Sequence, residues 1–389
     1  HGVYDDRIYW KEAVSLKKGG YEVHVVAMGN KNESGITDEG IFYTQLERKT
    51  YFKSRVINKL YKILFKKEFH HEILKAAKEI GAGVYHFHDV NLNKIVKGLK
   101  QITPVPIIIN DVHEPYPENI IDYKSYSKKI GVLNQFISSR IKLLEKKASR
   151  YYDHIIATEE VVASKFVSYT CVNRVSVLYN YFMDDQFETD GTDEKRYDGI
   201  YTGSITKIRG AIEIIEAIGI VKRQIPTIKF LFLGKIHCDS LKDEMNYKIN
   251  RLGLETNIFI VDSVPFNEVG HYYLKSKVGF GIFKDNKTHR TILPIKTFEY
   301  MAFGLPIICS YFSVMGKYVT KHNCGILVDP DKPEQIATGF IQLLTNNQAV
   351  SEMGSLGRNA VNNFYTWNSE EKKLLKIYSK LLEDGPVKA

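Results

Sequence analysis

Cysteine is scarce in this sequence, and the four that occur lie far apart with no C-x-x-C pair: Cys171, Cys238, Cys309 and Cys324. This spacing argues against a disulfide framework and against a zinc site, and it is typical of a protein in a reducing cytoplasm. Long apolar runs are also missing, because no segment approaches the ~18 residues that a membrane-spanning helix needs. The sequence therefore argues against a disulfide-stapled scaffold and against a bundle of membrane helices.

The composition is that of a folded chain, with 44% apolar and 25% charged residues and no repeat or low-complexity tract. A length of 389 residues exceeds what one compact core usually needs, so we expect two domains. The sequence opens on His1 within what looks like a loop, and we expect a first strand ahead of the numbered residues. A targeting segment in that region would not be visible.

The net charge of +9 is unevenly distributed. Residues 48–67 contain eight basic residues and no acidic one, interleaved with apolar residues near helical spacing. This pattern predicts a basic amphipathic helix, which suits anionic lipid headgroups. A second such stretch, "NQFISSRIKLLEKKASRYY", covers 134–152. Each alone could be an ordinary solvated helix, but two in the same half favour contact with a membrane surface. Nucleic acid is not expected as a partner, because no recognition motif accompanies the charge.

Short β-rich runs alternate with helical stretches along the whole chain. Runs such as 82–89, 105–113 and 229–235 favour parallel sheets that are covered by helices on both faces. A polar, acidic stretch at 184–196 has no apolar pattern and is interpreted as a linker.

The resulting prediction is an α/β chain with two doubly wound, Rossmann-like domains that face a central cleft. The first domain is predicted to cover residues 1–183 and the second residues 197–365. An amphipathic helix within residues 366–389 is expected to fold back across the first domain. In such folds, ligands bind beyond the carboxyl ends of the strands.

The stretch "LPIKTFEYMAFGLPII", residues 293–308, places one carboxylate, Glu299, near the start of a predicted helix. Pro294 suits the first helical position, and the free amides of that first turn would favour a phosphate. A carboxylate one to two turns into the helix can accept two hydrogen bonds from the diol of a ribose. This segment is therefore interpreted as a nucleotide-binding site. The structural alternative is a glutamate that only caps its own helix.

A second anion site is predicted in "YTGSITKIRGAIEIIEAI". Gly203 and Ser204 end a strand there, and Lys207 and Arg209 precede a helix. A glycine turn with two cations and a helix N-terminus suits a diphosphate, although ordinary strand-to-helix turns also carry exposed lysines. Two anion sites and a diol-binding carboxylate in one domain favour a nucleoside diphosphate as the ligand.

These segments resemble the retaining glycosyltransferases of family 4, which have the two-domain GT-B fold, and the resemblance covers nearly the whole chain. "LPIKTFEYMAFGLPII" is similar to "P-x-K-x-x-E-Y-M-A-x-G-x-P", and "YTGSITKIRG" is similar to "G-R-L-x-x-x-K-G". "NDVHEPYPE" looks like the "DVHE-x-YPE" variant, and "HGVYDDRIYWKEAVSLKKGGYEV" resembles the first loop and helix of one branch.

The resemblance implies roles for several residues of the second domain. Glu299 matches the glutamate that binds the ribose of the donor, and Arg209 matches the lysine that binds its diphosphate. Gly203 belongs to the glycine turn that holds the donor. Ser204 stands where many members have an arginine, so Lys296 or Lys207 is expected to supply part of that charge.

One position departs from the family pattern. Thr291 stands where the family often has a second glutamate that contacts the sugar, and the amides of Thr291, Ile292 and Leu293 are expected to do part of its work. The D-x-D at 329–331 spells a motif of metal-dependent glycosyltransferases, but it ends a late strand and opens a helix. Because the GT-B fold works without a metal, we interpret it as a helix cap and expect neither a metal nor another cofactor.

The first domain is expected to supply the reacting centre and the acceptor side. His88 matches the histidine of the family near the reacting centre, with Asp89 beside it, and a core histidine that ends a strand is the structural alternative. For His86 we prefer that alternative, because we expect strand alternation to turn it to a different face. The acceptor-side candidates are Arg7, His113 and Glu114.

The resemblance implies transfer with retention, in which the acceptor attacks from the leaving-group face and the departing phosphate takes its proton. No carboxylate pair with one member placed as a nucleophile is visible, which disfavours a covalent route. We expect His88, Asp89 and Arg209 to be the catalytic residues, with Arg209 stabilising the charge that develops on the phosphate.

We therefore expect a metal-independent hexosyltransferase that takes a sugar from a nucleoside-diphosphate donor, most readily a UDP-sugar. A lipid-linked or polysaccharide acceptor in bacterial surface glycan synthesis fits a cytoplasmic enzyme that is peripheral at the inner face of the cell membrane. Two alternatives stay open: a sugar-nucleotide epimerase or phosphorylase of the same fold, and a catalytically silent GT-B module that binds glycans or a partner enzyme.

Overall fold

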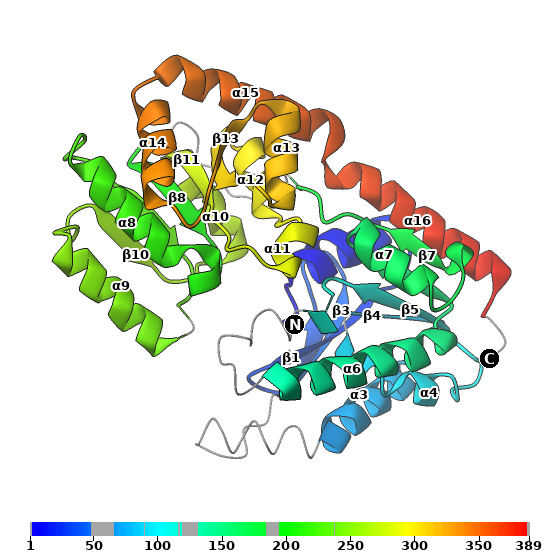
Figure 1. The fold of residues 1–389 in the computed structure, drawn as a ribbon. Helices are drawn as coiled ribbons and strands as arrows, with labels where there is room; N and C mark the ends of the chain where they lie inside the picture. The colour runs from blue at the N-terminus through cyan, green and yellow to red at the C-terminus, as the bar shows by residue number, and fades with distance from the viewer. Residues whose placement is uncertain are drawn as a thin grey trace. The chain divides into compact units, whose positions relative to one another are not determined.

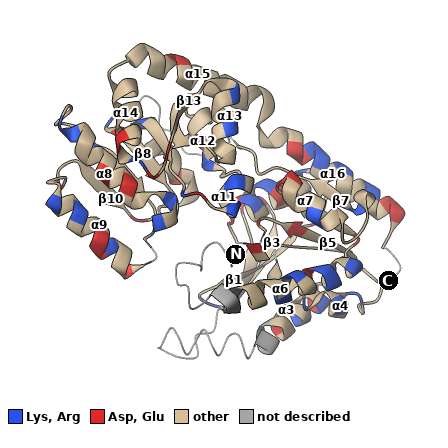
Figure 2. Ribbon diagram, viewed as in Figure 1, with Lys and Arg blue, Asp and Glu red and all other residues tan. Residues whose placement is uncertain are grey.

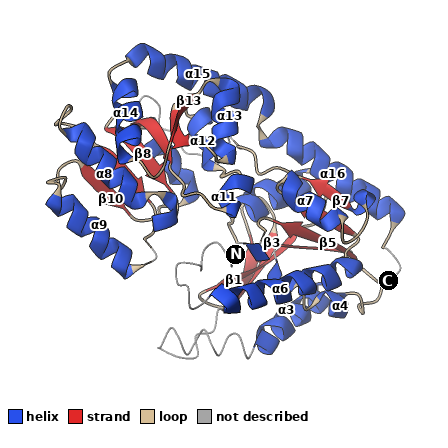
Figure 3. Ribbon diagram, viewed as in Figure 1, coloured by secondary structure: helices blue, strands red, loops and turns tan. Residues whose placement is uncertain are grey.

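A computed structural model of the chain (Figure 1) describes residues 2–47, 66–88, 90–115, 117–118, 131–183, 194–236 and 238–386. The chain forms two compact units. Unit 1 comprises His1–Asn180 and Trp367–Ala389, and unit 2 comprises Tyr181–Thr366. In both units the strands lie against helices (Figure 3), as continuous apolar runs between amphipathic stretches predict.

The described residues of unit 1 form two small sheets. The first has the order β1–β3–β2, in which β1 is parallel and β2 antiparallel to β3. The second has the order β4–β5–β6–β7, with every pair parallel. The strands are β1 (His24–Gly29), β2 (Glu33–Ile36), β3 (Phe42–Glu47), β4 (Val84–His88), β5 (Ile107–Val112), β6 (His154–Ala157) and β7 (Val175–Val177). Every residue of β5 and β6 is buried, which explains why both read as continuous apolar runs.

The helices of unit 1 pack against these sheets and against one another. They are the π-helix η1 (Asp6–Ala13), α1 (Val14–Lys18), α3 (Lys66–Ile80), η2 (Val90–Leu92), α4 (Val96–Leu99), α6 (Gly131–Ala148), η4 (Ser149–Tyr151), α7 (Glu160–Val167), η5 (Val172–Arg174) and α16 (Trp367–Asp384). Helix α16 is tied to the rest of unit 1 by side chains. The Trp367 indole donates to Ser15 Oγ (2.9 Å), and Glu370 accepts from the Tyr179 N–H (3.0 Å).

The two predicted basic helices differ in how far the structure describes them. Residues 48–65 of the first lie outside the described residues, and the helix over 134–152 forms as α6 and η4. On α6, Phe136 and Leu143 are exposed, and the helix also carries lysines and arginines (Figure 2). Among the described residues, no helix combines the length and the apolar character needed to cross a bilayer. Contact of α6 with a membrane surface stays a prediction.

A buried histidine makes the stability of the chain depend on pH. His154 on β6 is bonded through Nε2 to Ser176 Oγ (2.9 Å), and burial, with a further contribution from Lys380, lowers its pKa to about 4. Because the unfolded chain binds a proton near pH 6.5 and the folded chain does not, we expect stability to fall below pH 6.5. The expected slope is about 1.4 kcal/mol per pH unit down to pH 4.

Urea unfolding at pH 7 and pH 5 measures this effect, with His154→Gln as the comparison. Wild type should lose about 2 kcal/mol more than the variant over this interval. Equal losses in the two proteins would show that His154 is not the group responsible.

Within residues 194–236 and 238–366, unit 2 forms a fully parallel sheet of six strands in the order β10–β9–β8–β11–β12–β13. The strands are β8 (Tyr197–Thr202), β9 (Phe230–Leu233), β10 (Ile258–Val261), β11 (Ser276–Gly281), β12 (Ile307–Ser310) and β13 (Gly325–Val328). From β8 the chain extends the sheet in one direction through β9 and β10, and from β11 it extends the sheet in the other direction through β12 and β13. The topological switch point therefore lies at the carboxyl ends of β8 and β11.

The helices of unit 2 bury the sheet and form its apolar core. They are η7 (Lys207–Arg209), α8 (Ala211–Lys222), α9 (Asp239–Arg251), η8 (Phe266–Glu268), α10 (Val269–Leu274), α11 (Lys287–Thr291), α12 (Lys296–Ala302), α13 (Val314–His322), α14 (Pro333–Leu344) and α15 (Asn347–Phe364). Seven of the twelve residues of α8 are buried. A helix that is buried on most of its sides needs apolar residues around its circumference, which explains the sequence "AIEIIEAIGIVK".

The unit boundaries lie close to the expected domain ends. Residues 181–183 were expected in the first domain but belong to unit 2, because Tyr181 packs on Phe298 (ring centroids 5.1 Å apart) and Phe182 forms a β-bridge with Thr366. Residues 184–193 of the expected linker lie outside the described residues.

Candidate functional site

The turn after β8 brings two cations to the switch point of unit 2. Gly203 has φ of 97°, and a Cβ added there would lie 3.1 Å from Lys296 Nζ and 3.8 Å from Arg209 Nη1. Lys296 and Arg209 therefore flank the exposed Gly203 backbone, although they are 87 residues apart in the sequence. Gly234, at the end of β9, allows the close approach of this turn, since a Cβ there would lie 2.1 Å from the Gly203 carbonyl oxygen.

Lys296 is held inside the fold by its own side chain. Its Nζ donates to the Thr202 carbonyl and lies 4.3 Å from the centroid of the Tyr201 ring. Burial and then the charge of Arg209 hold the pKa of Lys296 well below its ordinary value, against the opposing effect of Glu299. An anion beside Lys296 and Arg209 would stabilise both charges, so this pair is suited to a phosphate group.

Of the two lysines expected to replace the missing arginine at Ser204, only Lys296 flanks the glycine turn. Lys207 is half exposed and forms an ion pair with Glu244 of α9. Ser204 itself is half-buried, and its carbonyl accepts from the Tyr201 hydroxyl (2.8 Å). The structure therefore favours Lys296 as the compensating cation.

Glu299 is oriented by a chain of hydroxyl groups that sequence reasoning missed. Only 5% of the residue is exposed, and Oε2 accepts from the Tyr273 hydroxyl (2.5 Å). The Tyr273 hydroxyl also bonds to Thr202 Oγ1 (3.1 Å), which in turn is 3.2 Å from the Tyr300 hydroxyl. These contacts fix the carboxylate next to the end of β8, and they do not involve capping of its own helix by the Glu299 side chain.

The backbone amides ahead of Glu299 differ in part from expectation. The helix α12 has seven residues and begins at Lys296, two residues after Pro294. Some of its early amides are engaged within the chain, because Thr297 N–H donates to Pro294 O (3.0 Å) and Glu299 N–H donates to Ile295 O (3.2 Å). A phosphate site on the first turn of this helix stays a prediction.

One amide of the segment around Thr291 differs from expectation. The Ile292 N–H donates to Thr288 O (2.9 Å), so this amide is engaged within the chain and is not open to a ligand. The Thr291 hydroxyl is bonded to Lys287 O (2.9 Å), because α11 ends in this short turn. Leu293, the residue after Ile292, is half-buried.

Unit 1 holds a buried cluster of charges that starts from the π-helix η1. The i→i+5 spacing of this helix places Arg7 and Glu12 on one face. The Nε atom of Arg7 lies 2.8 Å from Asp111 Oδ2 on β5 and 2.9 Å from Glu12 Oε1. All three residues are at most 3% exposed. One guanidinium therefore contacts two buried carboxyl groups.

Three imidazoles lie next to these charges. His88 and Asp111 are register partners on β4 and β5, and His88 Nδ1 lies 3.5 Å from Asp111 Oδ2. His113, just after β5, places Nε2 3.3 Å from the same oxygen and 3.1 Å from His88 Nδ1. The His86 ring stacks on that of His88 with centroids 4.8 Å apart. Our expectation that His86 turns to a different face is wrong, since residues i and i+2 of a strand share a face.

The environment shifts the pKa values of Asp111 and Glu12 in opposite directions. Burial alone would raise the pKa of Asp111, but Arg7 and His113 more than offset it, so this pKa lies well below its ordinary value. Burial and then the charge of Asp111 raise the pKa of Glu12 well above its ordinary value, against the opposing effect of Arg7. Burial also lowers the pKa of His86 and His88, which favours neutral rings with a nitrogen able to accept a bond.

Sequence reasoning missed Glu12 and Asp111, although a signal for both exists. Asp111 is a charged residue inside the apolar run "VPIIINDVH", and Glu12 follows Arg7 at a spacing that only a π-helix turns to one face. Of the other expected residues, Glu114 is exposed just after His113, and Asp89 lies outside the described residues.

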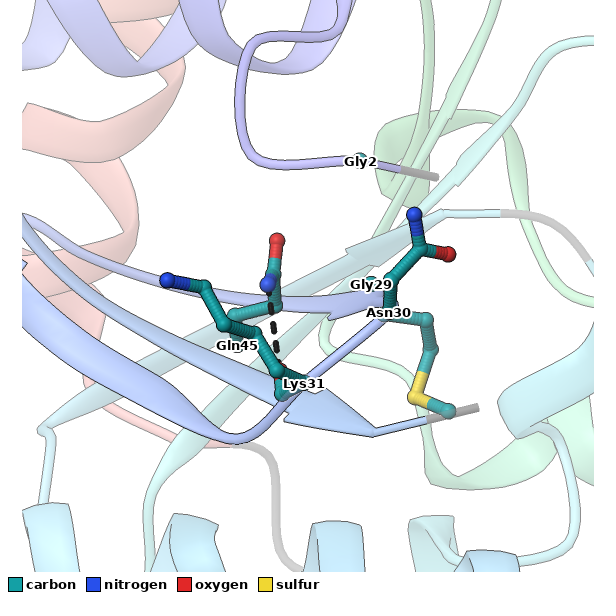
Figure 4. A pocket seen from close by; sticks show the side chains of 6 residues that line it. Gly2, Gly29, Asn30, Lys31 and Gln45 are labelled. Carbon is teal, nitrogen blue, oxygen red and sulfur yellow. Dashed lines mark hydrogen bonds between the residues drawn. The ribbon is translucent and has the colours of Figure 1, made fainter. Parts of the chain in front are cut away.

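A hollow of about 620 Å³ opens at the carboxyl end of β1 (Figure 4). It is lined by Gly2, Met28, Gly29, Asn30, Lys31 and Gln45. The Gln45 amide donates to the Lys31 carbonyl (3.1 Å), and Gly29 leaves room for it, since a Cβ there would lie 2.0 Å from the Gln45 side chain. None of the residues expected from the sequence lines this hollow.

Two family models match the chain in succession. The model described as Glycosyltransferase Family 4 matches residues 11–182, and the model described as Glycosyl transferases group 1 matches residues 182–360. CapM, a capsular polysaccharide biosynthesis glycosyltransferase of Staphylococcus aureus, is 22% identical over 261 residues, which are 63% of this chain and 66% of CapM. The uncharacterized glycosyltransferase MJ1069 of Methanocaldococcus jannaschii is 22% identical over 66% of this chain and 62% of its own length. The match thus spans just under two thirds of these relatives.

Solved structures share the fold over almost the whole chain. Sucrose-phosphate synthase from Thermosynechococcus elongatus has a TM-score of 0.74 at 16% identity, and the match covers 96% of this chain and 92% of that one. HepE from Anabaena, solved with UDP and glucose, has a TM-score of 0.66 at 12% identity over 92% of this chain and all of its own. These likenesses confirm the predicted fold class.

Proposed function

Since the chain is a GT-B glycosyltransferase of the group 1 and family 4 type, we propose that it transfers a sugar from a UDP-sugar with retention. The observation that carries the proposal is the convergence of Arg209, Lys296 and Glu299 at the switch point of unit 2. The two cations suit a diphosphate, and the hydroxyl-anchored carboxylate suits the diol of a ribose. The choice of UDP is supported by HepE of Anabaena and TarM of Staphylococcus aureus, which were solved with UDP.

The proposed mechanism uses the phosphate itself as the base. The acceptor hydroxyl attacks from the face that the diphosphate leaves, and its proton passes to the departing β-phosphate. Arg209 and Lys296 stabilise the negative charge that develops on that phosphate. We assign His88 and Asp89 to the reacting centre by the family resemblance and expect transfer to be independent of added metal.

The proposed acceptor is a lipid-linked or polysaccharide glycan. CapM, which the chain resembles, is a capsular polysaccharide biosynthesis glycosyltransferase. Within unit 1, Arg7, His113 and Glu114 are proposed for the acceptor side, and the hollow lined by Asn30 and Gln45 offers amides for sugar hydroxyl groups. The basic, partly apolar surface of α6 is proposed to bring the enzyme to an anionic membrane surface.

Calorimetry against UDP, GDP and ADP, each with and without magnesium, tests the donor site. We expect UDP to bind without the metal and Glu299→Ala to weaken binding by at least about 100-fold, because two hydrogen bonds to a charged group are lost. Tyr273→Phe keeps the carboxylate and should weaken binding by roughly 2- to 10-fold.

Glu352→Ala on α15 is the matched control, because Glu352 is exposed and accepts a hydrogen bond from Gln348 of its own helix. It should leave the affinity for UDP unchanged. Absence of nucleotide binding in wild type would overturn the proposal and favour a silent module, and equal affinities in wild type and Glu299→Ala would overturn the role of Glu299.

A further inference from the structure

The buried cluster of unit 1 includes four side chains with metal-ligand chemistry. One donor atom each from Glu12, His86, His88 and Asp111 lies within 4.8 Å of the other three. His86 Nε2 is 3.6 Å and His88 Nε2 is 3.9 Å from the same carboxylate oxygen, Glu12 Oε2. Tetrahedral ligands at zinc bond lengths lie about 3.3 Å apart, so the two Glu12 distances lie within about 0.6 Å of that spacing, and the longest separation in the set would have to close by up to about 1.5 Å around an ion.

Several of these donor atoms lack a hydrogen-bond partner. Among the residues that the structure describes, His86 Nε2, Glu12 Oε2 and Asp111 Oδ1 are buried without one. Glu12 is 2% exposed and Asp111 is fully buried. Buried polar atoms are nearly always bonded to protein, water or an ion, so the unpartnered His86 Nε2 and Glu12 Oε2, which lie 3.6 Å apart, indicate a ligand.

The outer sides of the same residues are held in the way that metal ligands usually are. His86 Nδ1 lies 2.9 Å from the Tyr378 hydroxyl, and His88 Nδ1 lies on the side of Asp111 and His113. Arg7 holds the other oxygen of Glu12, Oε1, at 2.9 Å. These contacts turn both Nε2 atoms and Oε2 inward, and such outer partners fix ring orientation in metal sites.

We propose that Glu12, His86 and His88, with an oxygen of Asp111, bind a divalent transition-metal ion. Two imidazoles and carboxylates suit zinc, cobalt or iron, whereas magnesium and calcium prefer oxygen ligands alone. The site lies within unit 1 and does not depend on the proposed donor site. An ion there occupies His88 Nε2, so metal binding competes with the proposed role of His88 at the reacting centre.

Zinc binding to the chelator-treated full chain, measured by calorimetry without nucleotide, tests this site. We expect one ion per chain. His86→Gln and Glu12→Gln should each weaken zinc binding by at least about 100-fold, because each removes a ligand. Tyr378→Phe leaves all ligands in place and should weaken it by about 10-fold, because it removes only an outer contact.

His24→Gln is the matched control, since His24 on β1 is exposed and bonds to Thr44 outside the cluster. It should bind zinc as wild type does. The visible absorption of bound Co²⁺ should disappear in His86→Gln and persist in His24→Gln, with circular dichroism to confirm that each variant is folded.

Two outcomes would overturn the metal site: no stoichiometric binding by wild type, or wild-type affinity in both His86→Gln and Glu12→Gln. Should the ligand variants not fold, wild-type affinity in Tyr378→Phe, together with a zinc anomalous signal elsewhere in wild-type crystals, would do the same. Binding of UDP is measured separately, so failure of the donor site and failure of the metal site are distinguishable.

Discussion

Replacement of Arg7 by methionine is expected to lower the free energy of unfolding by about 3–5 kcal/mol. The side chain is 3% exposed, and its guanidinium contacts both Asp111 and Glu12. Methionine fills similar space but leaves the buried Asp111 carboxylate without its cation. The cost is the desolvation of that charge, which no water can relieve while the fold is intact.

Urea unfolding at pH 7 measures the change. Lys31→Met is the matched control, because the Lys31–Glu33 pair is exposed and should contribute less than about 1 kcal/mol. The double variant Arg7→Met with Asp111→Asn should regain part of the lost stability, since it removes the uncompensated charge. A loss below about 1 kcal/mol for Arg7→Met would contradict the buried-pair account.

Replacement of Arg209 by alanine is expected to slow sugar transfer by roughly 100- to 1,000-fold. Arg209 flanks the Gly203 turn together with Lys296, and the proposed mechanism requires both cations as the β-phosphate departs. Interactions that strengthen as charge develops act on kcat more than on the dissociation constant of the donor. We therefore expect the larger change in kcat, measured as release of UDP from the donor.

Arg209→Lys should keep part of the rate, because a lysine supplies the charge without the planar fork of the guanidinium. Arg223→Ala, at the exposed C-terminal end of α8, is the control and should leave the rate unchanged. A fall of less than fivefold in Arg209→Ala would mean that the charge on the departing phosphate is stabilised by other groups.

Local patterns predicted most of the strands and the glycine turn. The apolar runs 105–113 and 229–235 form β5 and β9, because a strand covered on both faces must be apolar along its length. Gly203 and Arg209 lie where the sequence places them, at the end of β8 and ahead of α8. These features depend on neighbours a few residues away, which the sequence displays directly.

Predictions that depended on backbone detail were less successful. The amides of Thr297 and Ile292 are bonded within the chain, because short helical turns close on the carbonyls just before them. The face of His86 was misjudged even though the alternation rule answers it. A proline and a glutamate in sequence do not reveal which carbonyls the intervening N–H groups will reach.

The sequence by itself determined the fold class, most of the strands, and the turn that carries Gly203 and Arg209. Only the tertiary structure decided which charges meet. Arg7 reaches Asp111 across 104 residues of chain, and Lys296 reaches Thr202 across 94. The physical reason is that hydrophobic periodicity is a local property of the chain, whereas the pairing of buried polar groups depends on the register and packing of distant strands.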